Sequence, residues 1–359
     1  MIPGGPLEVG GRSRLFPVMN TPKNRGRALV VGAALAMTTA FTSACSVADP
    51  LPPVALGTPA PSGWILFQQD AGTRQEVALI RADGSGRTAL VHDLGEGHQT
   101  NPDWSPDGKH VVFAMNDGER DDLWVADVDG EHARLLLDCR GRCRWLDDPA
   151  WSPDGKRIVY SRTIERADGW GIGTLETVAV ATGKVRVELG PWKRSFTAGA
   201  RFSPDGRQVV FEKVHKTGRG PESDIDAVTL SAAHLDKKTH PVRALTDPRL
   251  FAATADWSSD GTRIVYSALA ERDAEAPDLF WIRPSGGAPT RLTDVVVAGG
   301  FAAEPAWLPD GSGVLFSGLL EEGSGSPELL RVRLDGSGVG PAFGDQTVFG
   351  RHPRAQPAS

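Results

Sequence analysis

The sequence lacks the short motifs that mark most hydrolases and nucleotide-binding enzymes. It contains no Gly-x-Ser-x-Gly, no His-Glu-x-x-His and no glycine-rich phosphate loop between a strand and a helix. Its eight histidines are scattered along the chain rather than grouped. A serine-hydrolase elbow, a zincin site and a P-loop are therefore excluded. The sequence predicts no catalytic residue and no cofactor.

An excess of positive charge is also missing. The formal net charge of the 359 residues is -6. Without residues 1–44 the chain keeps 34 basic and 44 acidic residues, so the remainder is more acidic still. An acidic protein is a poor match for nucleic acid or for anionic lipid, and neither is expected as a partner.

Cysteine is scarce, with three in the chain. Cys139 and Cys143 are four residues apart, and in an oxidising compartment this spacing favours a local disulfide that staples a loop. Two cysteines without a second pair or nearby histidines make a poor zinc site, so no metal is predicted there.

Long apolar runs are absent apart from Ala28–Phe41, which follows the basic residues Lys23, Arg25 and Arg27. A basic region, a short apolar region and small residues predict an export signal over residues 1–44, and the run is short for a membrane span. The small residues before Cys45 resemble the lipobox of bacterial lipoproteins, although Thr42 stands where leucine is usual. The resemblance implies lipidation of Cys45, and plain secretion is the alternative. The proline-rich residues 45–62 then read as a tether.

What the chain does contain is one turn, repeated five times. Each copy has an aromatic residue (in most cases Trp) followed by Ser-Pro-Asp-Gly or a close variant, and an apolar strand comes next. The copies are Trp104–Gly108, Trp151–Gly155, Phe202–Gly206, Trp257–Gly261 and Trp307–Gly311. Ser, Pro and Gly at these positions suit a type I turn that closes a hairpin, so the aspartates are interpreted as turn residues rather than as metal ligands or catalytic acids.

Repeats about 50 residues apart with only strands between them predict a β-propeller. We expect an all-β, six-bladed propeller of four-stranded antiparallel blades over residues 63–350, and a disordered tail over 351–359. The first blade lacks the turn motif and an innermost strand. Two segments are candidates to supply that strand, 346–350 near the C-terminus and 54–58 near the N-terminus, with a slight preference for the first.

The Trp-Ser-Pro-Asp-Gly-Lys pattern followed by an Ile-Val-Phe-type strand resembles the TolB-like propeller repeat. That repeat is found in the periplasmic protein TolB and, more loosely, in propellers of prolyl-oligopeptidase-type enzymes. The resemblance extends from about Gly63 to Phe343 and implies the fold. It does not imply a function, because propellers serve both as scaffolds and as enzymes.

In a propeller, the segments that lead into the innermost strands surround the mouth of the central channel. Here they offer aromatic, arginine and carboxylate side chains, a mixture typical of interaction surfaces. The predicted binding face consists of His98, Asn101, Arg144, Trp145, Asp148, Trp192, Arg194, Phe196, Arg249, Phe251, Phe301 and Glu304. The alternative is that these aromatics pack between blades and the charges are solvated.

Three functions remain open from the sequence. The favoured one is a monomeric, non-enzymatic propeller, held at the membrane by its lipid alone, that binds an envelope protein or a small ligand. The second is a metal-assisted lyase or hydrolase of extracellular carbohydrate or lactone, which needs a convergent set such as His98, Asn101, Asp148 and Glu304 in the channel. The third is an accessory subunit that gates the access of substrates to a hydrolase.

Overall fold

The computed structural model describes residues 63–357, apart from 92–93, 96, 142, 166–170, 194, 217–224, 237–238, 240 and 323–324. The predicted signal segment, tether and lipidation site at Cys45 lie outside the described residues. Within the described part of the chain, no helix is long and apolar enough to cross a membrane.

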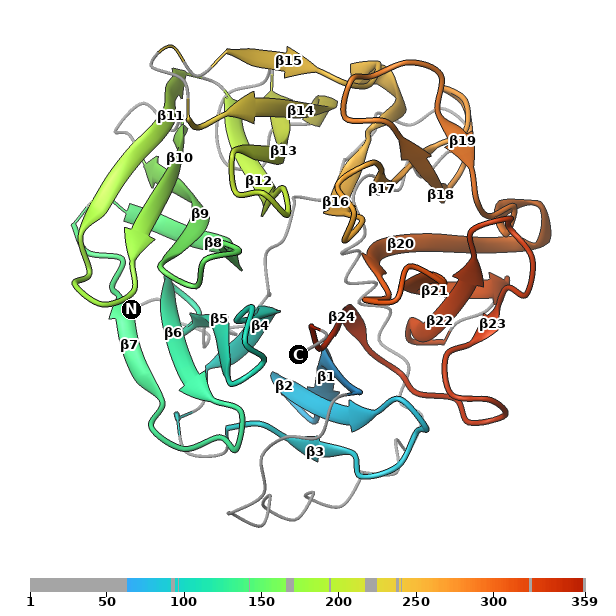
Figure 1. The fold of residues 1–359 in the computed structure, drawn as a ribbon, viewed down its shortest axis with the longest axis horizontal. Helices are drawn as coiled ribbons and strands as arrows, with labels where there is room; N and C mark the ends of the chain where they lie inside the picture. The colour runs from blue at the N-terminus through green and yellow to red at the C-terminus, as the bar shows by residue number, and fades with distance from the viewer. Residues whose placement is uncertain are drawn as a thin grey trace, which may run out of the picture.

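Six four-stranded antiparallel sheets are arranged in a ring around a central axis, called the channel below, so the six-bladed propeller is confirmed (Figure 1). Each sheet is one blade, with its innermost strand named first. Blades one and two are β24 (Arg351–Ala355), β1 (Trp64–Ala71), β2 (Arg74–Arg81), β3 (Thr88–Ala89), and β4 (His98–Trp104), β5 (His110–Asn116), β6 (Asp121–Asp127), β7 (Arg134–Leu137). Blades three and four are β8 (Cys143–Trp151), β9 (Arg157–Glu165), β10 (Gly171–Ala179), β11 (Val185–Lys193), and β12 (Ser195–Phe202), β13 (Gln208–Lys216), β14 (Ile225–His234), β15 (Val242–Ala244). Blades five and six are β16 (Ala253–Trp257), β17 (Ile264–Leu269), β18 (Pro277–Ile282), β19 (Thr290–Arg291), and β20 (Gly299–Trp307), β21 (Gly313–Glu321), β22 (Glu328–Arg333), β23 (Gly340–Pro341).

The core lies between neighbouring blades, and the second strand of each blade supplies its largest side chains. The aromatic residue near the middle of that strand is buried in every blade: Phe67, Phe113, Tyr160, Phe211, Tyr266 and Phe316. Clusters of buried side chains cross blade boundaries, as where Leu66 of blade one and Phe113 of blade two share one cluster. Burial of apolar surface between blades therefore holds the ring together.

Hydrogen bonds of the serine and the aspartate stabilise the repeated turn. In blade two, Ser105 Oγ donates to Asp107 Oδ1 at 2.5 Å, and the same carboxylate oxygen accepts the backbone N–H of Lys109 at 3.1 Å. Equivalent serine–aspartate bonds recur in blades three, four and five. An aspartate that accepts a backbone N–H two residues ahead is an ordinary turn device, which supports the structural reading of the turn aspartates.

The tryptophan that precedes the turn connects blades. The indole N–H of Trp104 donates to the carbonyl of Arg354 at 3.0 Å, and the indole N–H of Trp257 donates to the carbonyl of Arg201 at 3.3 Å. Trp307 bonds in the same way to Asp256 at 3.2 Å. In each case the acceptor lies on the innermost strand of the preceding blade. The indole ring of the tryptophan thus packs in the core, and its single N–H donates a hydrogen bond to the preceding blade.

The C-terminus closes the ring, but not with the segment expected. Strand β24 (Arg351–Ala355) pairs with β1, so the prediction of a disordered tail over 351–359 is wrong for residues 351–355, and the prediction of a closing strand at 346–350 is wrong in position. The sequence Arg-His-Pro-Arg is largely polar and lacks the terminal aromatic residue of the other inner strands. It becomes ordered because three of its residues are buried in the channel wall.

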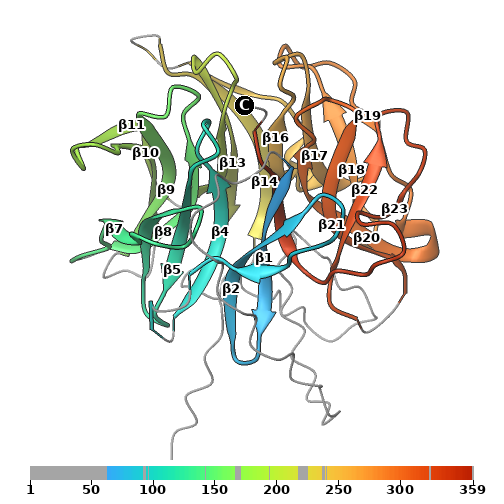
Figure 2. The same cartoon turned by 60° about the horizontal axis from the view of Figure 1, so that its bottom comes forward.

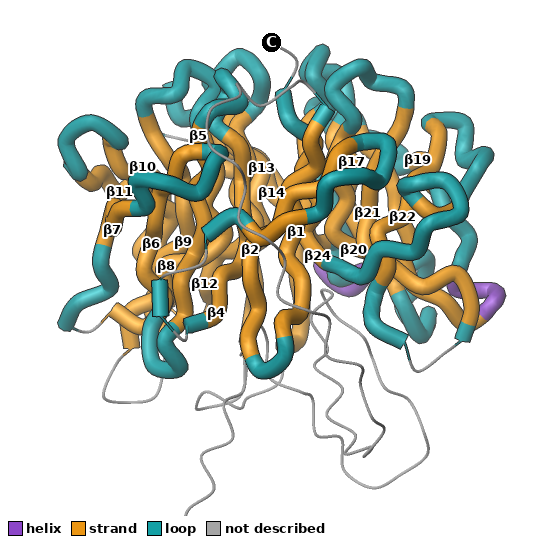
Figure 3. Tube along the Cα trace, turned by 90° about the horizontal axis from the view of Figure 1, so that it is seen from below, coloured by secondary structure: helices purple, strands orange, loops and turns teal. Residues whose placement is uncertain are grey.

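The two faces of the propeller differ. We call the face with the Ser-Pro-Asp-Gly turns the turn face, and the opposite face, where the inner strands begin, the mouth face. The short helices η1 (Pro248–Leu250) and η2 (Val296–Ala298) precede inner strands and mark the mouth face, at the bottom of Figure 3. The C-terminus emerges at the other end (Figures 2 and 3). The chain also enters there, because Gln356 N–H donates to the carbonyl of Trp64 at 2.8 Å.

Candidate functional site

The inner strands carry one repeated distortion, a β-bulge three residues before the terminal aromatic position. In blade two the register shifts between Thr100 and Asp103, and Asn101 lies in the left-handed region at φ 50°. The same shift occurs in all six blades. We call the residues at this position the bulge ring: Asn101, Asp148, Gly199, Thr254, Glu304 and His352, with φ between 49° and 58°.

The bulge ring is joined from blade to blade by hydrogen bonds. The backbone N–H of His352 donates to Glu304 at 2.9 Å, and that of Glu304 to Thr254 Oγ1 at 3.2 Å. Gly199 N–H donates to Asp148 at 2.8 Å. A left-handed backbone at a threonine or glutamate is strained, and such strain persists only where the surroundings fix it. Here a side chain of the preceding blade fixes the bulge residue by accepting its backbone N–H.

Blade four has glycine in the bulge ring, and a buried acid takes the place of the missing side chain. A Cβ on Gly199 would lie 2.5 Å from Glu212 Oε1. Glu212, on the second strand β13, accepts the backbone N–H of Thr254 at 2.6 Å. Burial, followed by the negative charge of Asp148, raises the pKa of Glu212 from 4.5 to about 8.

Carboxylates gather around Asp148. Burial and the charge of Asp148 hold the pKa of Asp147 well above its usual value. Burial also raises the pKa of Asp121 to about 7, with nearby carboxylates, including Asp148, contributing. On the opposite wall Glu304 pairs with His352 at 3.2 Å, and burial lowers the pKa of that imidazole. The mouth half of the propeller is therefore rich in acidic side chains near Asp148, and burial raises the pKa of three of them, Asp121, Asp147 and Glu212.

A second repeated position lies at or just before the beginning of the inner strands, six residues before the terminal aromatic position. It holds His98, Trp145, Phe196, Phe251, Phe301 and Phe349, and we call this set the collar. None is fully buried, and Phe349 is 48% exposed. Phe196 and Phe251 pack partly against Val214 and Val228 of blade four. Five aromatic side chains thus occupy equivalent positions at the mouth-face end of their blades and keep part of their surface accessible.

The predicted binding face is divided by the structure. His98, Trp145, Phe196, Phe251 and Phe301 lie in the collar, and Asn101, Asp148 and Glu304 lie in the bulge ring. The others lie elsewhere. Trp192 is stacked on Phe211 at 6.0 Å between the ring centroids and packs in the core, while Arg249 is exposed and paired with Asp247. The guanidinium of Arg144 lies 5.6 Å from the ring centroid of Trp145, and Arg194 lies outside the described residues.

Most of these residues were expected in loops, but the structure places them in strands. The inner strands begin earlier than the sequence suggested, at Cys143 in blade three and Gly299 in blade six. Sequence reasoning also missed Glu212, His352 and Phe349. Asn101, Asp148, Glu304 and His352 are each followed by proline, and this repeated pair could have identified both the bulge ring and the closing strand.

The metal set considered from the sequence does not assemble. Asn101, Asp148 and Glu304 lie on different blades, and His98 Nδ1 accepts the backbone N–H of Gln75 at 3.2 Å, between blades one and two. Among the described residues, no group of three or more His, Cys, Asp or Glu side chains is arranged to hold a metal ion.

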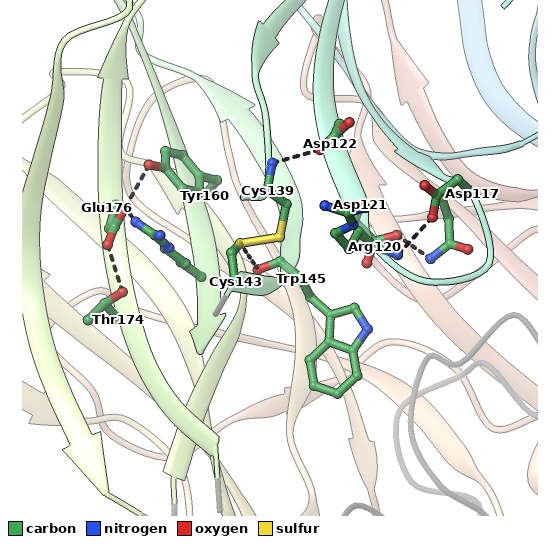
Figure 4. Close-up of a disulfide and its surroundings, with 12 residues drawn as sticks. Asp117, Arg120, Asp121, Asp122, Cys139, Cys143, Trp145, Tyr160, Thr174 and Glu176 are labelled. Carbon is green, nitrogen blue, oxygen red and sulfur yellow. Dashed lines mark hydrogen bonds and ion pairs between the residues drawn. A yellow bond between two sulfur atoms is a disulfide. The ribbon is translucent and has the colours of Figure 1, made fainter. Parts of the chain in front are cut away.

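The sulfurs of Cys139 and Cys143 form a disulfide, which holds the turn that leads into β8 (Figure 4). Both cysteines are buried in the cluster between blades two and three. The backbone N–H of Cys139 also donates to Asp122 at 2.7 Å. The bond therefore fixes the start of the strand that carries Trp145 and Asp148.

Replacing both cysteines by alanine is expected to lower the free energy of unfolding by about 2 kcal/mol, since the bond closes a loop of only a few residues. Urea unfolding under oxidising conditions measures the loss. In a reducing buffer the native chain and the variant should unfold alike. Equal stability under oxidising conditions would contradict a stapling role.

Comparison with known proteins shows similarity in fold. No protein-family profile matches the chain, and no curated protein sequence matches it. TolB from Acinetobacter baumannii superimposes with a TM-score of 0.61 at 18% identity, over 82% of this chain and 67% of that one. Hydrazine synthase from Kuenenia stuttgartiensis has a TM-score of 0.60 at 15% identity, over 82% of this chain and 46% of that one. A puromycin-hydrolyzing peptidase of Mycobacterium tuberculosis has a TM-score of 0.57 at 16% identity, over 86% of this chain and 48% of that one. This chain has a TolB-like propeller and spans about half the length of the two enzymes.

Proposed function

We propose that this chain is an exported, non-enzymatic propeller, anchored through Cys45, that binds a protein partner at its mouth face. The observation that carries the proposal is the collar, in which one position in all six blades holds an aromatic or histidine side chain that is not fully buried. Aromatic side chains provide much of the energy at protein interfaces, because they bury a large area at low entropic cost.

The chemistry below the collar favours a segment with both apolar and basic side chains. Asp148 is partly exposed, with Asp147 and Glu212 near it, whereas Glu304 is buried and paired with His352. A lysine or arginine that reaches this region gains both from the aromatic faces and from the carboxylate of Asp148. We therefore propose a partner that presents an apolar and basic stretch of chain.

The position of Trp64, where the first strand begins, also favours the mouth face as the binding surface. Trp64 begins β1 at the turn face, where Gln356 also lies. A tether that joins the propeller at this point is attached to the face opposite the collar. The collar is then accessible to a partner in the envelope.

Alanine in place of Trp145, Phe301 and Phe349 is expected to weaken partner binding at least about 30-fold, because buried aromatic anchors each contribute on the order of 2 kcal/mol. The partner is isolated by mild crosslinking from envelope fractions, and its affinity is then measured by calorimetry. The matched control replaces the exposed valines Val187 and Val242, on the outer strands β11 and β15, by alanine. Undiminished binding by the collar variant, or equal loss in the control, would overturn the proposal.

A further inference from the structure

The inner strands hold a second ring of side chains, one residue before the terminal aromatic position. Starting from blade one it reads Arg354, Asp103, Ala150, Arg201, Asp256 and Ala306. The order Arg-Asp-Ala occurs twice around the channel, so that blades one to three repeat in blades four to six. We call these six residues the Arg–Asp ring.

The two halves of the Arg–Asp ring also repeat each other in their contacts. Asp103 Oδ2 accepts the backbone N–H of Trp151 at 2.9 Å, and Asp256 Oδ2 accepts that of Trp307 at 2.9 Å. Arg201 Nη1 donates to the carbonyl of the preceding residue at 2.9 Å, as Arg354 Nη1 does at 3.1 Å. Arg354 Nη1 also donates to the carbonyl of Pro305 at 3.3 Å, so backbone acceptors hold both guanidinium groups.

Hydrogen-bond donors are in surplus in this ring. Arg201 and Arg354 are each 7% exposed, and within the described part of the chain neither Nε–H has a hydrogen-bond partner. Arg354 Nε lies 3.8 Å from Asp103 Oδ1, close enough for an ion pair but too far for a hydrogen bond. Each aspartate already accepts a backbone N–H. A guanidinium has five donors, and each of these two arginines keeps its Nε–H without an acceptor among the residues that the structure describes.

The two arginines also repel each other. Burial, and then the positive charge of Arg201, lowers the pKa of Arg354, and the charges of Asp256, Asp103 and Glu304 offset only part of this effect. A negatively charged ligand between the two groups would relieve this repulsion. Ala150 and Ala306 add no long side chain at their two positions of the ring, although both are buried, and Asp103 and Asp256 are partly exposed to solvent.

We propose that the Arg–Asp ring binds a small oxyanion, such as a carboxylate or sulfate group, between Arg201 and Arg354. The oxyanion accepts hydrogen bonds from both guanidinium groups, which recognise such groups with well-defined geometry. This site lies deeper in the channel than the collar and is independent of the protein partner proposed above.

The test titrates the purified propeller with sulfate and, separately, with acetate, each against chloride at constant ionic strength, using calorimetry. We expect at least one of the two to bind. Arg201→Gln should then weaken its binding at least about tenfold, because a charge-assisted hydrogen bond is lost. The control Arg331→Gln changes an exposed arginine on β22 and should bind as the native chain does. Binding of acetate would indicate a carboxylate ligand, and binding of sulfate would indicate a sulfate-like ligand.

A second measurement does not depend on a folded variant. Crystals of the native chain soaked in selenate should show anomalous density between Arg201 and Arg354. Failure of both anions to bind together with an empty channel in the soaked crystal, or equal binding by native and Arg201→Gln chains, would overturn the proposal.

Discussion

A chain that ends at Gly350 is expected to yield no folded propeller. The truncation removes β24, the innermost strand of blade one, and leaves the edge of β1 unpaired. It also removes the acceptor of the Trp104 indole N–H and the His352 partner of Glu304. The truncation therefore removes contacts of blade one with both blade two and blade six. The ring then opens at blade one, where β24 joins the two ends of the chain. The expected cost exceeds about 5 kcal/mol, the whole stability of many domains.

The measurement compares soluble yield, circular dichroism and urea unfolding of the truncated chain with those of a chain that ends at Pro357. The longer control keeps β24 and the Gln356 contact with Trp64, and it should unfold as the full chain does. A soluble, cooperatively unfolding chain that ends at Gly350 would show that the C-terminal strand does not close the propeller.

Glu212→Gln is expected to stabilise the propeller increasingly as the pH rises. The folded chain keeps Glu212 protonated up to about pH 8, whereas the unfolded chain ionises it near 4.5. Between these values the unfolded state binds fewer protons, so the native chain loses stability as the pH increases, by up to ~1.4 kcal/mol per pH unit. Glutamine resembles the protonated acid and still accepts the Thr254 N–H.

Urea unfolding should therefore give similar stabilities near pH 5 and a variant that is more stable by roughly 4 kcal/mol near pH 8.5. Glu271→Gln makes the same chemical change at an exposed site and should not alter the pH dependence. Parallel pH profiles for the native chain and Glu212→Gln would show that the buried acid is ionised in the folded state.

The fold could be predicted from the sequence because its repeated signal is local. A turn such as Trp104–Gly108 is formed by contacts within five residues, and the buried aromatic residue of the next strand follows at a fixed distance. The disulfide between Cys139 and Cys143 is local in the same sense. Such features can be read from one stretch of chain without knowledge of its neighbours.

The candidate site was harder to predict because it depends on contacts between blades. Glu212 reads as an ordinary residue of an alternating strand, and its role depends on Gly199 in the same blade and Thr254 in the next. The closing strand was missed because Ala355 replaces the aromatic residue that marks the other inner strands. Alignment of the six inner strands on their bulges, rather than on their turns, identifies both.

Site-specific photocrosslinking tests most directly the claim that the mouth face is the binding surface. A photoreactive phenylalanine analogue is placed at Phe349 in the collar or at Val187 on the outer strand β11, which are 48% and 52% exposed. The account predicts that the analogue at position 349 captures one envelope protein in living cells and that the analogue at position 187 captures none. Capture at position 187 with none at 349 would place the binding surface on the outer edge of the blades and contradict the account.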